Sequence, residues 1–377
     1  MTHRVKSAIF AVVLLGVTFV IAEVALRVAQ YLVSGTSPTT LLPLYRERRF
    51  VMSPFLVFGP RIDWQIANTP NPDAAYFNKQ ALRTKEIVGP KSPSEFRIIA
   101  IGGSTTEDVG NEEGLHWPLW VERELHRAGL GQVRVYNTGM SAYSSAHTLI
   151  RIAFDVLDYE PDMVLVMDNI NDLTVNYHAA LAGTPVDSHY HVKFGQKLYT
   201  FDLDEDDVIV SRLLHSIRSR LARTNERSVP ADYDISRGLG FFKRNLANTH
   251  ALVANAGART VLLTMPSCDS EEIYKLVEFY GRRQFSDPLP SFENFNRDFA
   301  RYNDGIREIA AVHGVTMVDM ARLFGSDRKY FADFVHYNAV GSKRFGGIVA
   351  EQLAPVIRDM MTTRAVAKPA DTAKSVN

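Results

Sequence analysis

From Phe96 onward the chain alternates short apolar runs with longer amphipathic stretches, and this alternation limits its possible fold more than any other feature. The apolar runs cover residues 97–102, 133–137, 163–167, 260–265 and 315–320. The amphipathic stretches cover residues 112–128, 145–158, 242–257, 294–313 and 339–360. Strands that alternate with helices form a parallel sheet covered on both faces. The sequence therefore predicts an α/β fold, a three-layer α/β/α sandwich around a mainly parallel five-stranded sheet.

The rest of the chain divides around this main domain. Because the rhythm of strands and helices breaks after Asp172 for too long to be an ordinary loop, we expect an insertion there. The small, polar residues at the C-terminus predict a disordered tail. The predicted parts are an N-terminal anchor or signal segment (1–35), a linker and irregular extension (36–95), the main domain (96–360) with its insertion (173–241), and the tail (361–377).

The N-terminal segment has the pattern of a membrane-spanning helix. Residues 8–22 carry no charge and follow Arg4 and Lys6. A helix of that length spans about 22 Å, less than the roughly 30 Å core of a bilayer, but the helical pattern continues to Val33. This continuity favours an uncleaved inner-membrane anchor over a secretion signal cut near Ala22. In either case the basic start predicts that the main domain lies in the periplasm or extracytoplasmic space.

Composition excludes several classes of function. The 42 basic and 42 acidic residues give no net charge, so nothing indicates a nucleic-acid partner. Cys268 is the only cysteine, so the chain can form neither an internal disulfide nor a thiolate metal cluster. His189 and His191 could supply two metal ligands, but the sequence places no third. We therefore expect neither a metal nor an organic cofactor.

Polar residues follow the predicted strands at the points where these strands end. Ser104 follows the first strand, Gly139 the second and Asn171 the third, while Asp333 and His336 follow the fifth and precede the last helix. Ligands of open α/β sheets bind outside the carboxyl ends of the strands. We therefore expect these five residues to lie around one site.

These residue types are the ones that acyl transfer requires. A serine hydroxyl becomes nucleophilic when a base such as His336 takes its proton, and Asp333 could hold that imidazole in one tautomer. The backbone N–H groups of Ser104 and Gly139 and the amide of Asn171 could stabilise an oxyanion. Taken alone, the stretch around Ser104 favours a serine or threonine that caps the helix that follows, and the other four residues shift the interpretation to catalysis.

Four short motifs resemble the conserved blocks of the SGNH or GDSL hydrolases. They are "GGSTT", "NTGMS", "NIND" and "DFVH", and they occur in this order within residues 96–360. The resemblance implies an SGNH hydrolase-like catalytic domain. It implies Ser104 as nucleophile, His336 as general base and Asp333 as the carboxylate that orients it. It also implies that Gly139 and Asn171 join Ser104 in the oxyanion hole.

Three positions depart from the family pattern. Gly103 stands where the family name has aspartate, Asn169 where the third block usually has glycine, and Ala142 where glycine is common after Ser141. These departures resemble the divergent, often membrane-anchored members of the family. Such relatives are similar to proteins that remove or add O-acyl groups on exported polysaccharides.

The sequence and the resemblance together predict a serine esterase that hydrolyses short acyl esters such as O-acetyl groups, with an acylated carbohydrate or another small ester as substrate. One alternative is an O-acyltransferase that uses the same residues. Another is a non-catalytic glycan-binding or secretion protein. The N-terminal helix makes the membrane a further predicted partner.

Other residues have alternative interpretations. Asp168 and Asp172 could form a glycosidase carboxylate pair, although a strand end and a helix cap explain their spacing equally well. The aromatic candidates for stacking on a sugar are Tyr177, Tyr190, Phe194 and Tyr199.

Overall fold

The computed structural model describes residues 3–34, 50–60, 62, 77–83, 86–87, 90–111, 114–182, 229–275 and 290–367. The chain divides into two compact units, residues 1–48 with 199–227 and residues 49–198 with 228–377. In the first unit, the described residues form a single helix, α1 (His3–Ser34). The second unit contains the sheet and its flanking helices.

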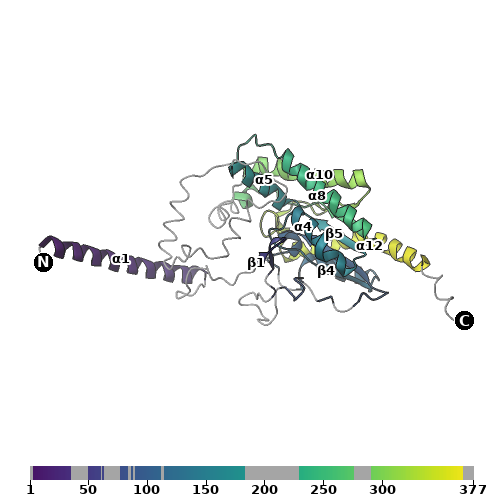
Figure 1. Ribbon diagram of the computed structural model, residues 1–377, viewed down its shortest axis with the longest axis horizontal. Coiled ribbons are helices and arrows are strands. Elements are labelled where there is room, and N and C mark those ends of the chain that lie inside the picture. The colour runs from purple at the N-terminus through teal and green to yellow at the C-terminus, as the bar shows by residue number, and fades with distance from the viewer. Residues whose placement is uncertain are drawn as a thin grey trace. The chain divides into compact units, whose positions relative to one another are not determined.

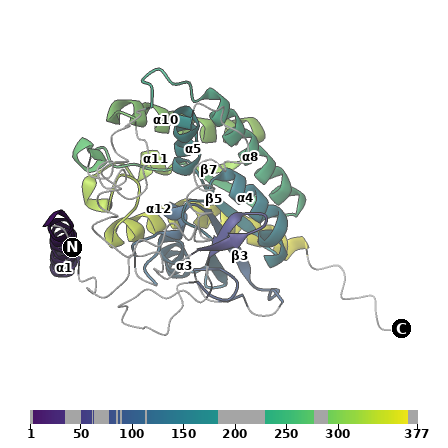
Figure 2. The ribbon, with the colours of Figure 1, turned by 60° about the vertical axis from the view of Figure 1, so that its left-hand side comes forward.

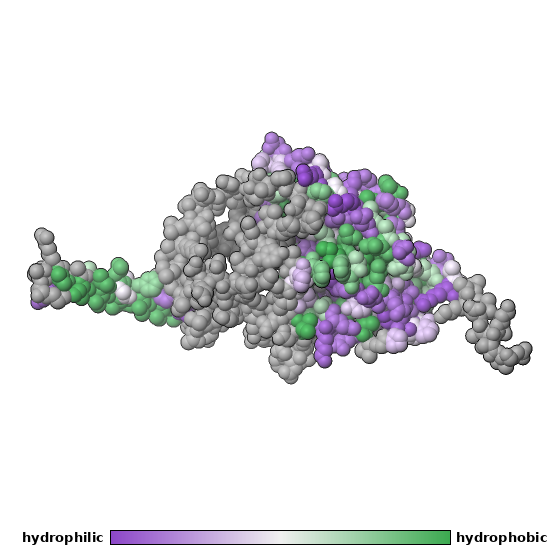
Figure 3. All heavy atoms as spheres, viewed as in Figure 1, coloured by the Kyte–Doolittle hydropathy of each residue, from purple (hydrophilic) through white to green (hydrophobic). Residues whose placement is uncertain are grey.

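Helix α1 contains a segment, Val5–Ala29, that is long and apolar enough to cross a membrane. Its 25 residues span about 38 Å, which exceeds the thickness of a bilayer core. The segment is longer than the uncharged run and includes Glu23 and Arg27, whose side chains pair one helical turn apart, with Arg27 Nε donating to Glu23 Oε1 at 2.7 Å. Figure 3 shows the described part of α1 mostly in the colour of apolar residues. The segment could be a membrane anchor or a signal sequence.

A parallel sheet of five strands forms the centre of the second unit, as the sequence predicts (Figure 1). Its strands are β3 (Phe96–Gly102), β4 (Val133–Asn137), β5 (Met163–Met167), β6 (Arg259–Leu263) and β7 (Thr316–Val318). Their order is β4-β3-β5-β6-β7, with Ile98 paired to both Val135 and Met163. Because β3 lies between β4 and β5, the chain reverses direction across the sheet there. Crevices that bind ligands form at such a reversal.

Helices cover both faces of the sheet (Figure 2). Helices α3 (Trp117–Arg127) and α12 (Ala339–Ala367) pack against each other on one face. The other face carries α4 (Ser145–Arg151), α5 (Ile170–Ala182), α8 (Ser236–Asn255) and α10 (Phe292–His313). The short elements are helix α2 (Ser104–Glu107), helix α11 (Met320–Leu323), the π-helical turn Ile152–Val156, and the 3₁₀ turns Leu157–Tyr159 and Arg328–Tyr330.

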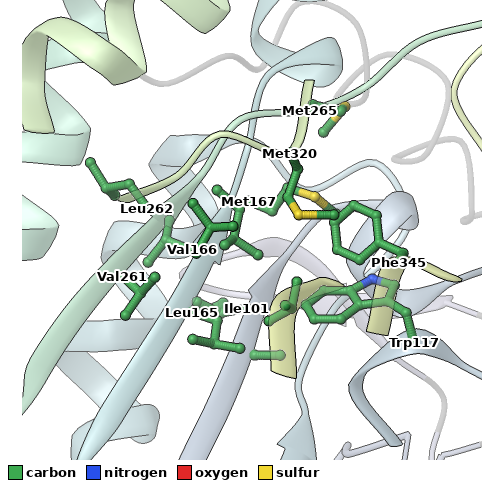
Figure 4. Packing of buried hydrophobic residues seen from close by; sticks show 14 of the residues in the cluster. Ile101, Trp117, Leu165, Val166, Met167, Val261, Leu262, Met265, Met320 and Phe345 are labelled. Atoms are coloured by element: carbon green, nitrogen blue, oxygen red, sulfur yellow. The ribbon is translucent and has the colours of Figure 1, made fainter. Parts of the chain in front are cut away.

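The hydrophobic core fixes the helices on the sheet. Every residue of β3 is buried, which agrees with a strand covered on both faces. The rings of Trp117 in α3 and Phe345 in α12 lie 4.9 Å apart, and Figure 4 shows them beside Ile101 of β3. Strand β3 precedes Ser104 and α3 follows it, while α12 follows His336. The packing of these elements therefore brings the serine and histidine segments together.

The N-terminal extension is more regular than its sequence suggests. Strands β1 (Phe50–Ser53) and β2 (Val57–Pro60) form an antiparallel hairpin. The hydroxyl of Tyr143 donates to the carbonyl oxygen of Phe58 at 2.8 Å, and the two rings lie 5.2 Å apart. The hairpin therefore packs against the loop that follows β4.

Three predicted boundaries differ from the structure. The helix predicted from residue 112 begins at Trp117, where the His116 Nδ1 accepts from the Leu119 N–H. The predicted tail begins too early, because α12 continues to Ala367 and Arg364 pairs with Asp162 at 3.0 Å. The predicted insertion overlaps both α5 and α8, while its residues 183–228 lie outside the described part of the chain.

Candidate active site

Ser104 stands just beyond the carboxyl end of strand β3. Strand β3 ends at Gly102, and Ser104 is the first residue of α2. A Cβ atom on Gly103 would lie 2.5 Å from Asn171 Nδ2 and 2.9 Å from the carbonyl oxygen of Tyr143. Glycine at position 103 therefore lets the Asn171 amide and the loop after β4 approach the backbone beside Ser104. Any larger residue at position 103 would force these groups to move.

The loop before α12 holds His336 through the carboxylate of Asp333. The Oδ1 atom of Asp333 accepts the backbone N–H groups of Val335 and His336, at 2.9 and 2.8 Å. The N–H of Cys268 donates to the carbonyl oxygen of Phe334 at 2.8 Å, which ties this loop to the chain after β6. The loop thus has a fixed conformation in which both side chains can face the same point.

Ser104, His336 and Asp333 form a continuous chain of hydrogen bonds. The Nε2 atom of His336 lies 2.7 Å from Ser104 Oγ, and its Nδ1 atom lies 2.7 Å from Asp333 Oδ2. An ionised carboxylate only accepts, so the proton of a neutral His336 is on Nδ1 and Nε2 is free to accept from the serine hydroxyl. This is the arrangement that activates a serine.

The charge state of Asp333 suits this role. Burial alone would raise its pKa, but the adjacent His336 ring and the two backbone N–H groups outweigh burial and lower the pKa below its usual value of 3.8. Asp333 is therefore ionised at neutral and mildly acidic pH. A loss of activity between about pH 5 and 7 would therefore not come from protonation of Asp333.

Asn171 also lies at this end of the sheet, in the first turn of α5. Its Nδ2 donates to the carbonyl oxygen of Tyr143 at 2.7 Å, which leaves the second amide hydrogen for another acceptor. The next residue, Asp172, accepts from both the N–H and the hydroxyl of Ser145, at 3.0 and 2.5 Å. The start of α5 therefore fixes the loop that runs from β4 into α4.

Gly139 lies in this loop, but its N–H is already bonded. It donates to Asn137 Oδ1 at 2.9 Å, and a Cβ atom on Gly139 would lie 2.2 Å from the backbone nitrogen of Glu107. Glycine is thus needed here for close packing against α2. Three residues later, Ala142 has a φ of 70°, a conformation that favours glycine. Within the described residues we find no acceptor for the N–H of Ala142.

Glu107 supports the same loop from the other side. Its Oε2 accepts from the backbone N–H and the hydroxyl of Ser141, at 2.6 and 2.8 Å. Sequence reasoning missed Glu107 because an acidic residue after "STT" is equally typical of an exposed turn, whereas here it is buried.

The carboxylate pair considered as a glycosidase site is not accessible to a substrate. Asp168 and Asp172 are both buried, at 2% and 0% exposure. Among the described residues, neither carboxylate oxygen of Asp168 has a well-formed hydrogen bond. Burial raises the pKa of Asp168 well above 3.8, the charge of Asp172 raises it further, and the nearby Thr148 hydroxyl opposes both.

The raised pKa of Asp168 predicts a specific pH dependence of stability. Above pH 3.8 the unfolded chain releases this proton while the folded chain retains it, so the free energy of unfolding falls as pH rises. The fall is at most about 1.4 kcal/mol per pH unit until the folded pKa is reached. Asp168→Asn removes this pH dependence. The free energy of unfolding of the variant should therefore rise relative to that of the wild type as the pH increases from 5 to 8. Urea unfolding of the full chain in detergent measures this gain.

The control for this experiment is Asp158→Asn, which changes an exposed carboxylate. We expect the stability of this variant to follow that of the wild type at each pH. A stability difference between Asp168→Asn and wild type that does not change with pH would contradict the buried, protonated Asp168.

The remaining predicted residues take no part in this site or lie outside the described residues. Tyr177 is fully buried and its hydroxyl donates to Asp298 Oδ2 at 3.0 Å, so it cannot stack on a sugar. The other stacking candidates and the two histidines lie outside the described part of the chain, namely Tyr190, Phe194, Tyr199, His189 and His191. Within the described residues no cluster of three His, Cys, Asp or Glu side chains is placed to hold a metal ion.

Comparison with known proteins identifies the sequence pattern around this site. A family model described as the GDSL-like lipase/acylhydrolase family matches residues 100–344, well over half of the chain. No curated protein sequence matches the chain.

Several solved structures resemble the fold. A lipase/acylhydrolase from Enterococcus faecalis is 18% identical, with 69% of this chain and 96% of that chain covered and a TM-score of 0.42. A GDSL-like lipase from Bacteroides thetaiotaomicron is 14% identical, with 73% and 93% covered and a TM-score of 0.40. A catalytic mutant of an acetylxylan esterase from Geobacillus stearothermophilus is 16% identical, with 69% and 93% covered and a TM-score of 0.40. At these values the likeness concerns the fold and carries no argument about substrate.

Proposed function

Because this chain belongs to the GDSL-like lipase/acylhydrolase family, we propose that it is a serine esterase that hydrolyses short acyl esters on an exported carbohydrate. The observation that carries the proposal is the chain of two 2.7 Å contacts from Ser104 through His336 to Asp333. Helix α1 supports the extracytoplasmic location, since it is apolar enough to anchor or export the chain.

The first half of the reaction acylates Ser104. Its Oγ attacks the ester carbonyl carbon while His336 Nε2 takes the hydroxyl proton. The tetrahedral intermediate collapses, the bond to the leaving alkoxide breaks, and the His336 imidazolium returns the proton to that alkoxide. Asp333 stabilises the imidazolium through Nδ1 without itself becoming protonated.

The second half releases the acyl group. Neutral His336 takes a proton from water, and the resulting hydroxide attacks the acyl-enzyme carbonyl. The bond from Ser104 Oγ to the acyl carbon then breaks and His336 returns the proton to the serine. The products are the carboxylic acid and the free carbohydrate hydroxyl. If a sugar hydroxyl replaced water in this step, the same residues would transfer the acyl group.

Stabilisation of the oxyanion needs donors near Ser104. We propose the backbone N–H of Ser104 and the free amide hydrogen of Asn171 for this role. The bond from the Gly139 N–H to Asn137 argues against Gly139 as the third donor. The N–H of Ala142 is the better candidate, because no described residue accepts it and the next residue, Tyr143, bonds to the Asn171 amide through its carbonyl oxygen.

Removal of the Asn171 amide tests the oxyanion assignment. We expect Asn171→Ala to lower kcat for p-nitrophenyl acetate about a hundredfold, because one preorganised donor is lost where negative charge develops. The control is Asn294→Ala, which changes a half-buried asparagine at the start of α10 and should leave kcat unchanged. Wild-type kcat in the folded Asn171→Ala variant would exclude Asn171 as a donor.

The substrate class is tested with acetylated oligosaccharides and the full chain in detergent. Mass spectrometry should show the loss of acetyl groups in the presence of wild-type protein, and no loss with Ser104→Ala. A gain of acetyl groups on an unmodified oligosaccharide, at the expense of an acyl donor, would replace the esterase by an acyltransferase. No change in either direction, with p-nitrophenyl acetate still hydrolysed, would refute the carbohydrate substrate.

A further inference from the structure

The two residues that exchange the proton in the proposed reaction come from distant parts of the chain. Ser104 and His336 are 232 positions apart, one in α2 and the other in the loop before α12. Proton transfer is sensitive to small displacements of the reacting groups, so the relative position of these two segments has to be held. The structure contains a buried set of polar side chains between them.

Asp108 links the serine segment to α12. The N–H of Asp108 donates to the carbonyl oxygen of Ser104 at 2.9 Å, so the two residues belong to one rigid turn. The Oδ2 atom of Asp108 accepts from the hydroxyl of Ser342 in α12 at 2.5 Å and from the N–H of Trp117 at 2.8 Å. Both Asp108 and Ser342 are buried, at 1% and 0% exposure.

Asn111 links the same turn to the histidine segment. Its Nδ2 lies 3.1 Å from the carbonyl oxygen of Tyr337, the residue directly after His336. The same amide lies 2.9 Å from Asp108 Oδ1 and 2.8 Å from Ser342 Oγ. Asn111 thus connects the backbone beside His336 to the side chain that is tied to the Ser104 turn.

Arg83 completes this arrangement from the N-terminal extension. Its buried guanidinium donates to the carbonyl oxygens of Glu107, Asp108 and Asn111, and its backbone N–H donates to the carbonyl oxygen of Asn137 at 2.9 Å. Burying a guanidinium costs free energy unless acceptors or negative charges surround it, and the carboxylate of Asp108 supplies a negative charge. Arg83 lies outside the residues 100–344 that match the family model.

We propose that these four side chains, Arg83, Asp108, Asn111 and Ser342, form a positioning network that holds His336 against Ser104. None of them touches the proton-exchanging atoms of Ser104 and His336, so they are positioning residues and not catalytic ones. The inference rests on the proposed esterase function. The network makes the N-terminal extension part of the catalytic unit, because Arg83 binds the backbone of the turn that carries Asp108 and Asn111.

The first test removes one hydroxyl from the network. We expect Ser342→Ala in the full chain to lower kcat for p-nitrophenyl acetate about tenfold, because His336 moves relative to Ser104. KM should stay within about twofold, since the network does not face the substrate. The control is Thr249→Val in α8, where the buried hydroxyl has no partner among the described residues and lies outside the network. It should keep the wild-type kcat.

A second variant and a double variant separate positioning from a general loss of structure. Asn111→Ala should lower kcat in the same way, because the bond to the Tyr337 carbonyl is lost. In the His336→Ala background, Ser342→Ala should cause no further loss of the residual turnover, since there is no imidazole left to position. A merely structural effect of Ser342 would lower turnover by the same factor in both backgrounds.

The outcomes distinguish this inference from the function on which it rests. If His336→Ala keeps wild-type turnover, the proposed function fails. If His336→Ala loses turnover while folded Ser342→Ala and Asn111→Ala both keep the wild-type kcat, only the positioning network is refuted. An equal further loss in the double variant also refutes it.

Discussion

Ser104→Ala is expected to lower kcat for p-nitrophenyl acetate about ten-thousandfold or more, because the variant has no nucleophile to form the acyl-enzyme. His336→Ala should cause a loss of similar size, since a serine hydroxyl is a weak nucleophile when no base takes its proton. The double variant should be no slower than either single variant, because the two residues act as one unit. Steady-state kinetics on the full chain in detergent measures all three.

The matched control is Ser94→Ala. Ser94 is an exposed serine two residues before β3, at the end of the strand opposite to Ser104. It should keep the wild-type kcat. If Ser104→Ala folds and turns over the ester as fast as Ser94→Ala does, Ser104 is not the nucleophile.

Asp333→Asn is expected to lower kcat about a thousandfold at neutral pH, although the shape of the side chain hardly changes. An asparagine amide placed against His336 Nδ1 donates a hydrogen bond, which favours the tautomer with the proton on Nε2. That nitrogen then faces Ser104 Oγ with a proton and cannot accept another. The prediction follows from the 2.7 Å contact between Asp333 Oδ2 and His336 Nδ1.

Asp327→Asn serves as the control for this experiment. Asp327 precedes the same loop and pairs with Lys329 at 2.7 Å on the surface. Its replacement removes one negative charge from the same region, so it separates a general charge effect from the specific contact with His336. Equal kcat in the Asp333→Asn and Asp327→Asn variants would show that the carboxylate of Asp333 does not orient the base.

The main elements of the fold could be predicted because their patterns are local. The apolar run of β3 and the amphipathic stretch that becomes α10 differ from the structure by one or two residues at their ends. The side chains after the strands could also be assigned to one rim, because parallel strands end at the same edge of a sheet. His336 lies against Ser104 as that reasoning requires.

Other features could not be predicted because they depend on contacts with no local signature. The Arg83 side chain binds three backbone carbonyl groups, which any sequence could supply. The hairpin of residues 50–60 is stabilised in part by the Tyr143 hydroxyl, which is distant in the sequence. The bond from Gly139 to Asn137 depends on the conformation of one loop. The sequence therefore predicts the residues of the site but not the contacts that hold the surrounding loops in place.

The central claim is that Ser104 carries a hydroxyl activated by His336, and a fluorophosphonate probe tests it most directly. The probe forms a covalent phosphonyl ester with activated serines, and a peptide map of the labelled full chain locates the adduct. We expect one adduct on the peptide that contains Ser104, and none in Ser104→Ala. A natively folded wild-type protein that binds glycan but never reacts, or one whose adduct lies on another serine, would contradict the account.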